Sequence, residues 1–179
     1  MIYQPIIANA GVPMIALEMP LMLIALIPVI VVELFVAKRL CGLSWKRITL
    51  GVSAANIVST LIGVPLSWGL MLGLQLLTTG GGGYSGPLAM LVAVTVQAAW
   101  LLPYEEHLNW MVPTAMMVLF IPAFLISVWS ERLLCQLFWK DTERTVIKRA
   151  VWIFNLVSYG ILTAGVFIWL MISITSKTN

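Results

Sequence analysis

The chain has 179 residues, of which 61% are apolar and only 9% are charged, with a net charge of +3. A soluble domain carries about 25% charged residues, and the mean hydropathy is +1.02. This composition excludes an ordinary soluble protein and predicts one integral membrane domain over residues 1–179, with the lipid bilayer as its surroundings and no nucleic-acid partner.

The first apolar run extends over about residues 12–37. Glu18 and Pro20 mark its outer end, and Pro28 lies inside it, where proline usually kinks a membrane helix. A second apolar run, residues 48–77, is long enough to span a bilayer with some tilt. The loop between these runs is basic and has no acidic residue; its charged residues are Lys38, Arg39, Lys46 and Arg47.

Residues 78–110 form a connection without lysine or arginine. It begins with a run of glycines that predicts a loop, and it lacks the Lys-Ser/Thr pair of a phosphate-binding loop. Residues 88–102 are apolar but too short for a full span, which needs about 20 residues. We therefore expect a short interfacial or re-entrant helix there.

Two further apolar runs follow, at about residues 112–138 and 150–174. Glu131 interrupts the first of them, and a second basic loop separates the two. Cytoplasmic loops are enriched in lysine and arginine. Since nine of the ten basic residues lie in or beside the two short loops, both loops are predicted to be cytoplasmic and both termini external; these residues are Lys38, Arg39, Lys46, Arg47, Arg132, Lys140, Arg144, Lys148 and Arg149.

The predicted fold class is therefore an all-α membrane protein with four transmembrane helices. The helices form two tandem hairpins, residues 12–77 and 111–175, joined by the outer segment 78–110. The two hairpins resemble each other: in each, a glutamate precedes the basic loop and an Asn-x-Val-Ser motif follows it. Such parallel repeats, related by an axis along the membrane normal, occur among transporters.

These repeated positions predict a polar layer in the cytoplasmic half of the membrane. Its members are Glu33, Asn56, Ser59, Glu131, Asn155 and Ser158. In the second apolar run, small and polar residues share one stripe that allows close helix contact; they are Ser53, Asn56, Thr60, Gly63 and Ser67.

An ionisable group in a membrane segment is a candidate functional group because its burial is costly unless it is paired. For Glu33 and Glu131, one interpretation is structural: each pairs with Arg39, Arg132 or Asn56 and fixes helix packing. The alternatives are proton or cation handling and contact with a partner protein.

Glu105, Glu106 and His107 lie side by side in the outer connection. They could ligate a metal or act as acid and base, but the chain has no second histidine, and solvated loop charges are the simpler interpretation. Two cysteines show no CxxC motif. Ser59 and Ser158 have no evident base beside them in the sequence, so nucleophilic catalysis has no support. We expect no catalytic residue, metal or cofactor.

The segment WLLPYEEHLNWMVP, the hairpin with Glu33, Asn56 and Ser59, and the late Val-Trp-Ser-Glu together resemble a group of small uncharacterised bacterial four-helix membrane proteins. The first hairpin alone also resembles the cyanobacterial filament-integrity membrane proteins that act at cell–cell septa. This second resemblance implies a structural role in a membrane assembly.

We therefore expect a multi-pass protein of the bacterial cytoplasmic membrane that is a non-catalytic accessory or scaffold subunit of a larger complex. Its partners would be other membrane subunits or further copies of itself. The competing hypothesis is a small transporter or ion-coupled carrier that uses Glu33 and Glu131. Glutamates that are paired and closed off favour the subunit, whereas glutamates facing a wet cavity favour transport.

Overall fold

The computed structural model of the chain describes residues 12–78, 100–101 and 108–176. Four helices make up nearly all of this part, and each is long and apolar enough to cross a membrane. They are α1 (Met14–Cys41), α2 (Trp45–Thr78), α4 (Leu108–Phe138) and α5 (Arg144–Thr175). The all-helical membrane class that the composition predicts is confirmed.

Three helices extend beyond the apolar runs into the basic segments of the sequence. α1 continues to Cys41 and ends at Gly42, whose φ of 64° suits glycine and whose N–H bonds the carbonyl of Lys38. α2 begins at Trp45 and α5 at Arg144, before the hydrophobic stretches. Lysine and arginine are good helix formers and their long side chains reach water, so the helices do not end where the hydropathy falls.

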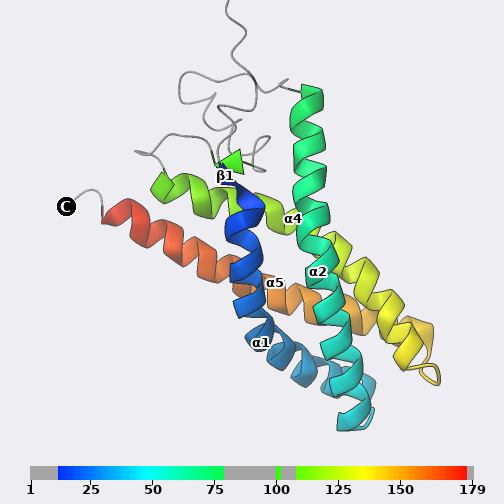
Figure 1. Cartoon of the computed structure of the whole chain (residues 1–179). Coiled ribbons are helices and arrows are strands. Elements are labelled where there is room, and N and C mark those ends of the chain that lie inside the picture. The colour runs from blue at the N-terminus through cyan, green and yellow to red at the C-terminus, as the bar shows by residue number, and fades with distance from the viewer. Residues whose placement is uncertain (1–11, 79–99, 102–107, 177–179) are drawn as a thin grey trace, which may run out of the picture.

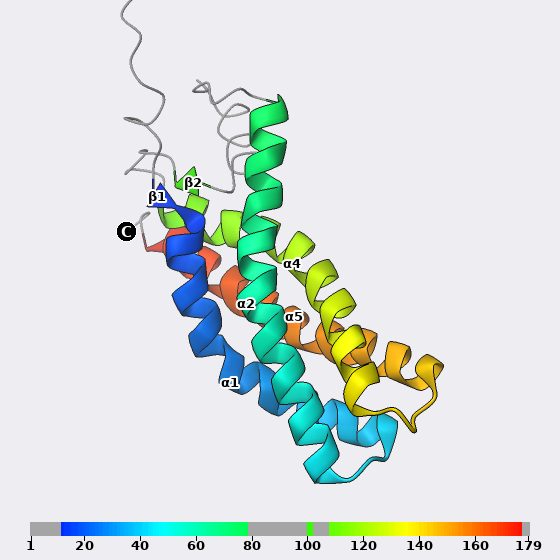
Figure 2. The same cartoon turned by 45° about the vertical axis from the view of Figure 1, so that its right-hand side comes forward.

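The four helices form a ring in which each helix packs mainly on two neighbours. The order around the ring is α1, α2, α4, α5 and back to α1. Figures 1 and 2 show that the α1/α2 pair crosses the α4/α5 pair. The two pairs converge toward the end that carries both short helix connections and diverge toward the other end.

Two apolar clusters fill the interior of the ring. The cluster at the converging end includes Ile48, Cys135, Trp139 and Phe154, and the cluster toward the diverging end includes Met22, Met71 and Leu119. Glu33, Asn56 and their partners lie between these clusters along the helices, so apolar packing separates them from both ends of the ring.

A pair of two-residue strands lies at the diverging end. β1 (Val12–Pro13) pairs antiparallel with β2 (Trp100–Leu101). The sequence predicted a short helix over residues 88–102; the structure describes only Trp100–Leu101 of it, where pairing with β1 replaces the helical turn. Residues 88–99 of that prediction, and Glu105, Glu106 and His107, lie outside the described residues.

Candidate functional site

The polar residues of the predicted intramembrane layer meet in the interior of the four-helix ring. They are Glu33 on α1, Asn56 and Ser59 on α2, Glu131 on α4, and Asn155 and Ser158 on α5. None of these side chains is more than 3% exposed. We call this group the polar ring.

Glu33 accepts one hydrogen bond on each carboxyl oxygen. Asn56 Nδ2 donates to Glu33 Oε2 at 2.6 Å, and Ser158 Oγ donates to Glu33 Oε1 at 2.6 Å. The first donor comes from the neighbouring helix in the sequence, whereas the second lies 125 residues away. Glu33 therefore joins α1 to both of its neighbours in the ring.

Glu131 has the matching arrangement on the opposite side of the ring. Asn155 Nδ2 donates to Glu131 Oε2 at 2.7 Å, and Ser59 Oγ donates to Glu131 Oε1 at 2.7 Å. Each glutamate thus binds the asparagine of its own helix pair and the serine of the other pair. The exchange of serines ties the α1/α2 pair to the α4/α5 pair.

The spacing within the Asn-x-Val-Ser motif explains why one helix can serve two glutamates. Residues three apart on an α-helix lie on the same side but diverge by about 60°, so Asn56 and Ser59 reach different neighbouring helices. The secondary contacts repeat as well: Asn56 and Asn155 each donate to the carbonyl four residues earlier at 3.1 Å. The helices of the ring consequently alternate between carboxyl acceptors on α1 and α4 and neutral donors on α2 and α5.

No lysine or arginine bonds to Glu33 or Glu131 within the described part of the chain. Of the three partners that the structural interpretation offered, Asn56 does bond Glu33. Arg39 and Arg132 bond neither glutamate, because amides and hydroxyls occupy the carboxyl oxygens. An ion pair is found instead at the converging end, where Arg47 lies 3.2 Å from Asp141 with both side chains exposed. Such exposed pairs contribute about 1 kcal/mol or less.

A small cavity of about 20 Å³ adjoins the two carboxyl groups. Besides both glutamates, its polar lining includes Thr60, Ser127 and Tyr159, and all four helices contribute to it. Ser127 and Tyr159 hydrogen-bond each other at 3.0 Å. Ser127 and Tyr159 were not singled out from the sequence, although Ser127 lies one helical turn before Glu131, on the same face.

Glu18, predicted only to mark the outer end of the first span, is a buried carboxyl group. It is 0% exposed, and neither of its oxygens has a hydrogen-bond partner among the described residues. Glu18 precedes Glu33 by 15 residues. The two side chains therefore diverge by about 60° around α1 and lie about 22 Å apart along it. The clue in the sequence was an acidic residue within the hydrophobic helix.

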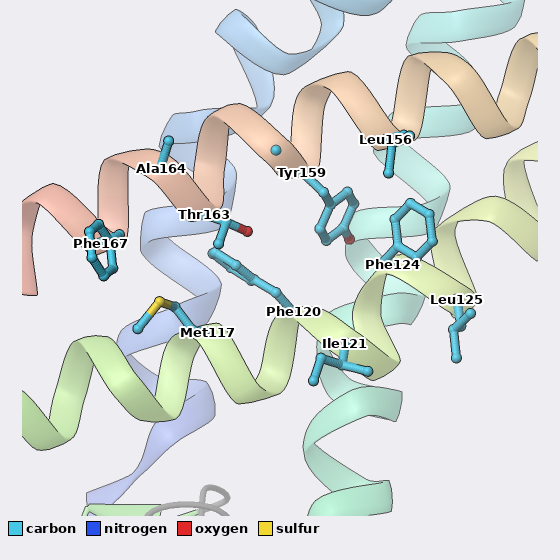
Figure 3. Close-up of a pocket in the computed structure, with 11 residues that line it drawn as sticks. Met117, Phe120, Ile121, Phe124, Leu125, Leu156, Tyr159, Thr163, Ala164 and Phe167 are labelled. Carbon is cyan, nitrogen blue, oxygen red and sulfur yellow. The ribbon is translucent and has the colours of Figure 1, made fainter.

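A larger, open groove of about 670 Å³ lies between α4 and α5. Figure 3 shows Met117 and Phe120 from α4, and Tyr159 and Thr163 from α5, pointing into the space between the two helices. The rings of Phe120 and Tyr159 meet edge to face at 6.0 Å between centroids. Apart from the Tyr159 and Thr163 hydroxyls, the groove-lining side chains are apolar.

The polar ring corrects one chemical expectation. Ser59 and Ser158 do each have a carboxyl within hydrogen-bond distance, supplied by the other helix pair. A serine beside a carboxylate base could in principle act as a nucleophile, but the adjoining cavity of about 20 Å³ leaves room for little more than one water molecule. No group of three potential metal-binding side chains of His, Cys, Asp or Glu occurs among the described residues.

Comparison of the chain with protein-family models, with curated proteins and with solved structures found no match. The chemistry of the polar ring is therefore argued from its own geometry.

Proposed function

We propose that this protein is a non-catalytic accessory or scaffold subunit of a larger membrane complex. The observation that carries the proposal is the closure of the polar ring: Glu33 and Glu131 are each 1% exposed, and every carboxyl oxygen accepts a hydrogen bond from another helix. Buried carboxyl groups whose oxygens are all bonded in this way fix the relative position of helices, although Asn155 Oδ1 of the same ring has no partner among the described residues.

The proposed architecture is two tandem hairpins, residues 12–77 and 111–175, that act as parallel repeats. The equivalence of Asn56 with Asn155, each bonded to the glutamate of its own hairpin, supports this arrangement. In such a protein neither hairpin completes the polar ring alone, since each lacks the serine that the other supplies. The second hairpin would therefore be required for the first to fold stably.

The proposed setting is the bacterial cytoplasmic membrane, with both termini outside. The convergence of the two basic helix connections at one end of the molecule supports this orientation, because cytoplasmic loops carry excess lysine and arginine. The bacterial assignment rests on the resemblance of the sequence motifs to small bacterial four-helix membrane proteins.

An ion-coupled carrier is the second candidate function. The observation that favours it is the presence of two carboxyl groups in one layer without a basic partner, an arrangement common on ion pathways through membranes. The cavity beside them, however, is only about 20 Å³, and apolar clusters lie on both sides of it along the helices. The geometry therefore supports the subunit better.

We further propose that one apolar transmembrane helix of another subunit occupies the α4/α5 groove. Gly160 and Ala164 line the groove four residues apart on α5, and small residues at this spacing allow helices in membranes to approach closely. The hydrophobic span of α5 is also the least buried of the four. A partner helix would cover this surface.

A pair of glycine substitutions on α5 tests the proposed partner surface. Gly160 lies in the groove and Gly165 does not, and a Cβ added at either position meets no atom within 4 Å. Both positions therefore have space for the first side-chain atom, and we expect Gly160→Leu and Gly165→Leu both to fold. Tagged proteins are purified from native membranes, and their stoichiometric partners are quantified by mass spectrometry; Gly160→Leu should reduce partner recovery about tenfold, while Gly165→Leu retains it.

Equal partner recovery from the two variants would refute the groove as the partner surface. A wild-type protein that is recovered from native membranes alone, or only with further copies of itself, would refute the accessory-subunit proposal.

A further inference from the structure

The polar ring brings two carboxyl groups together but supplies only neutral donors. The four donors to Glu33 and Glu131 are two amides and two hydroxyls. Two uncompensated negative charges in a membrane interior would be costly. The arrangement therefore calls for a positive charge that the described side chains do not provide.

The cavity beside the carboxyl groups has the size of a small ligand. Its volume of about 20 Å³ exceeds the roughly 10–15 Å³ that one water molecule requires. A large organic cation cannot fit, whereas a dehydrated alkali-metal ion or a water molecule can.

Thr60 provides an independent indication that this cavity receives a ligand. Its side chain is 8% exposed and lines the cavity, and no hydrogen bond joins its hydroxyl to any other residue that the structure describes. The Thr60 oxygen is not among the fully buried atoms that lack a partner, so a water-sized ligand in the cavity can reach it and supply the missing partner.

The lining also sets the chemical class of the ligand. The polar residues that line the cavity carry carboxyl, amide and hydroxyl groups; they are Glu33, Glu131, Asn56, Ser59, Thr60, Ser127 and Tyr159. The lining includes the thioether of Met22 but no cysteine or histidine. Carboxyl and hydroxyl oxygens suit hard cations rather than soft transition metals. Each carboxyl oxygen accepts one hydrogen bond from a side chain and retains a second lone pair for a ligand.

We propose that this cavity binds one positive charge. The charge is carried either by a sodium ion or by a proton that the carboxyl pair holds beside a water molecule. The bound charge neutralises one carboxylate and completes the polar ring. This assignment goes beyond the accessory role and does not rest on it, because a structural subunit and a carrier could both hold such an ion.

Few other titratable groups face the polar ring. α4 adds Cys135, one turn from Glu131, and α5 adds Tyr159, while Cys41 lies farther along α1. The side chains that α2 contributes, Asn56, Ser59 and Thr60, do not titrate. Glu33 and Glu131 are therefore the groups whose charge a bound cation would balance.

Thermal unfolding of the purified full chain in detergent tests the sodium form. In a series of samples, sodium chloride replaces choline chloride at constant ionic strength and pH. The midpoint temperature of unfolding should rise with the logarithm of the sodium concentration. Thr60→Val keeps the shape of the side chain and removes the hydroxyl, so about tenfold more sodium should be required for the same rise. Thr163→Val, in the α4/α5 groove, is the matched control and should behave as wild type.

Infrared spectroscopy of the same samples tests the proton form. In sodium-free buffer at neutral pH, a protonated-carboxyl stretch should be present and should be lost in Glu33→Gln or Glu131→Gln, but retained in Glu143→Gln on the surface. Thr60→Val should shift the frequency of this carboxyl stretch. Glu18→Gln identifies any part of the absorption that comes from the separate Glu18 carboxyl. Sodium that abolishes the stretch shows that sodium and proton exchange at one site.

A sodium-dependent midpoint supports sodium as the occupant, and a protonated carboxyl assigned to the pair without a sodium response supports the proton. The absence of both overturns the proposal. A Thr60→Val protein that matches wild type in both measurements also overturns it, and this variant decides the question even where the glutamine variants fail to fold.

Discussion

Single side chains show how this protein places two carboxyl groups inside a membrane domain. Each oxygen of Glu33 and Glu131 receives one donor at 2.6–2.7 Å. These bonds also satisfy the buried donors, since a buried amide or hydroxyl without a partner costs about 1–3 kcal/mol. Removing one glutamate therefore affects its two partners on other helices in addition to the site of the change.

Substitution of Glu33 should separate loss of charge from loss of hydrogen bonding. In Glu33→Gln the amide oxygen can accept from Asn56 while the amide N–H donates to Ser158, whose hydroxyl can turn to the Asn155 carbonyl at 3.1 Å. We expect a loss of at most about 1 kcal/mol in the free energy of unfolding. Glu33→Leu leaves both donors without this partner and should cost on the order of 3 kcal/mol.

The free energy of unfolding in mixed micelles measures both effects, and Glu143→Leu on the exposed connection controls for loss of an acidic residue. A Glu33→Leu protein as stable as Glu33→Gln would show that the hydrogen bonds of the polar ring do not hold the helices together.

Pairs of helices are held by close contacts as well as by the polar ring. At the converging end, Trp139 is fully buried, and its Nε1 donates to the carbonyl of Arg47 at 3.0 Å. Gly51 on α2 permits this approach: a Cβ there would lie 2.6 Å from Trp139 Nε1 and 2.8 Å from Cε2. The indole therefore packs directly against the backbone of α2.

Two glycine-to-alanine substitutions on α2 should have opposite effects. Gly51→Ala forces the buried Trp139 ring to move and should reduce the free energy of unfolding by about 1–3 kcal/mol. Gly69→Ala meets no atom within 4 Å and should raise it by up to about 1 kcal/mol, because alanine favours the helix. Thermal and chemical unfolding in detergent measure both.

Similar stabilities for the two alanine variants would contradict the close approach of Trp139 to α2.

The whole molecule brings its basic helix connections to one end. Lys38 donates to the carbonyl of Leu43 at 2.6 Å in the first connection, and Arg47 pairs with Asp141 of the second. The Arg47–Asp141 pair joins the two basic connections, which the distribution of lysine and arginine predicts to lie on the cytoplasmic side. The opposite end holds β1 and β2 and the final turn of α5.

Cysteine labelling in intact cells should report this orientation. In a background with Cys41→Ala and Cys135→Ala, Ser44→Cys and Asp141→Cys should be protected from a membrane-impermeant maleimide, whereas Ser176→Cys should react. The reason is that the first two lie in the two short connections and the third follows α5. Reaction of Ser44→Cys and Asp141→Cys on different sides of the membrane would contradict the four-span topology.

The membrane class, the four apolar helices and the candidate polar residues are all predictable from the amino-acid sequence alone. These properties are local: hydropathy over some 20 residues predicts a span, and an ionisable residue within a span is conspicuous wherever it occurs. The helix ends were less predictable, because basic residues continue a helix that hydropathy alone would end. Glu18 was visible in the sequence, but its complete burial was not.

Only the tertiary structure decided which helices face one another. Ser158 reaches Glu33 across 125 residues, and no local spacing distinguishes this exchange from a serine that bonds within its own helix pair. The cavity beside Thr60 and the contact of Gly51 with Trp139 likewise depend on the order and crossing of helices. A membrane helix is apolar toward lipid and protein alike, so hydrophobicity does not indicate which of its faces packs against other helices. The packing face is set by the contacts that form when all four helices assemble.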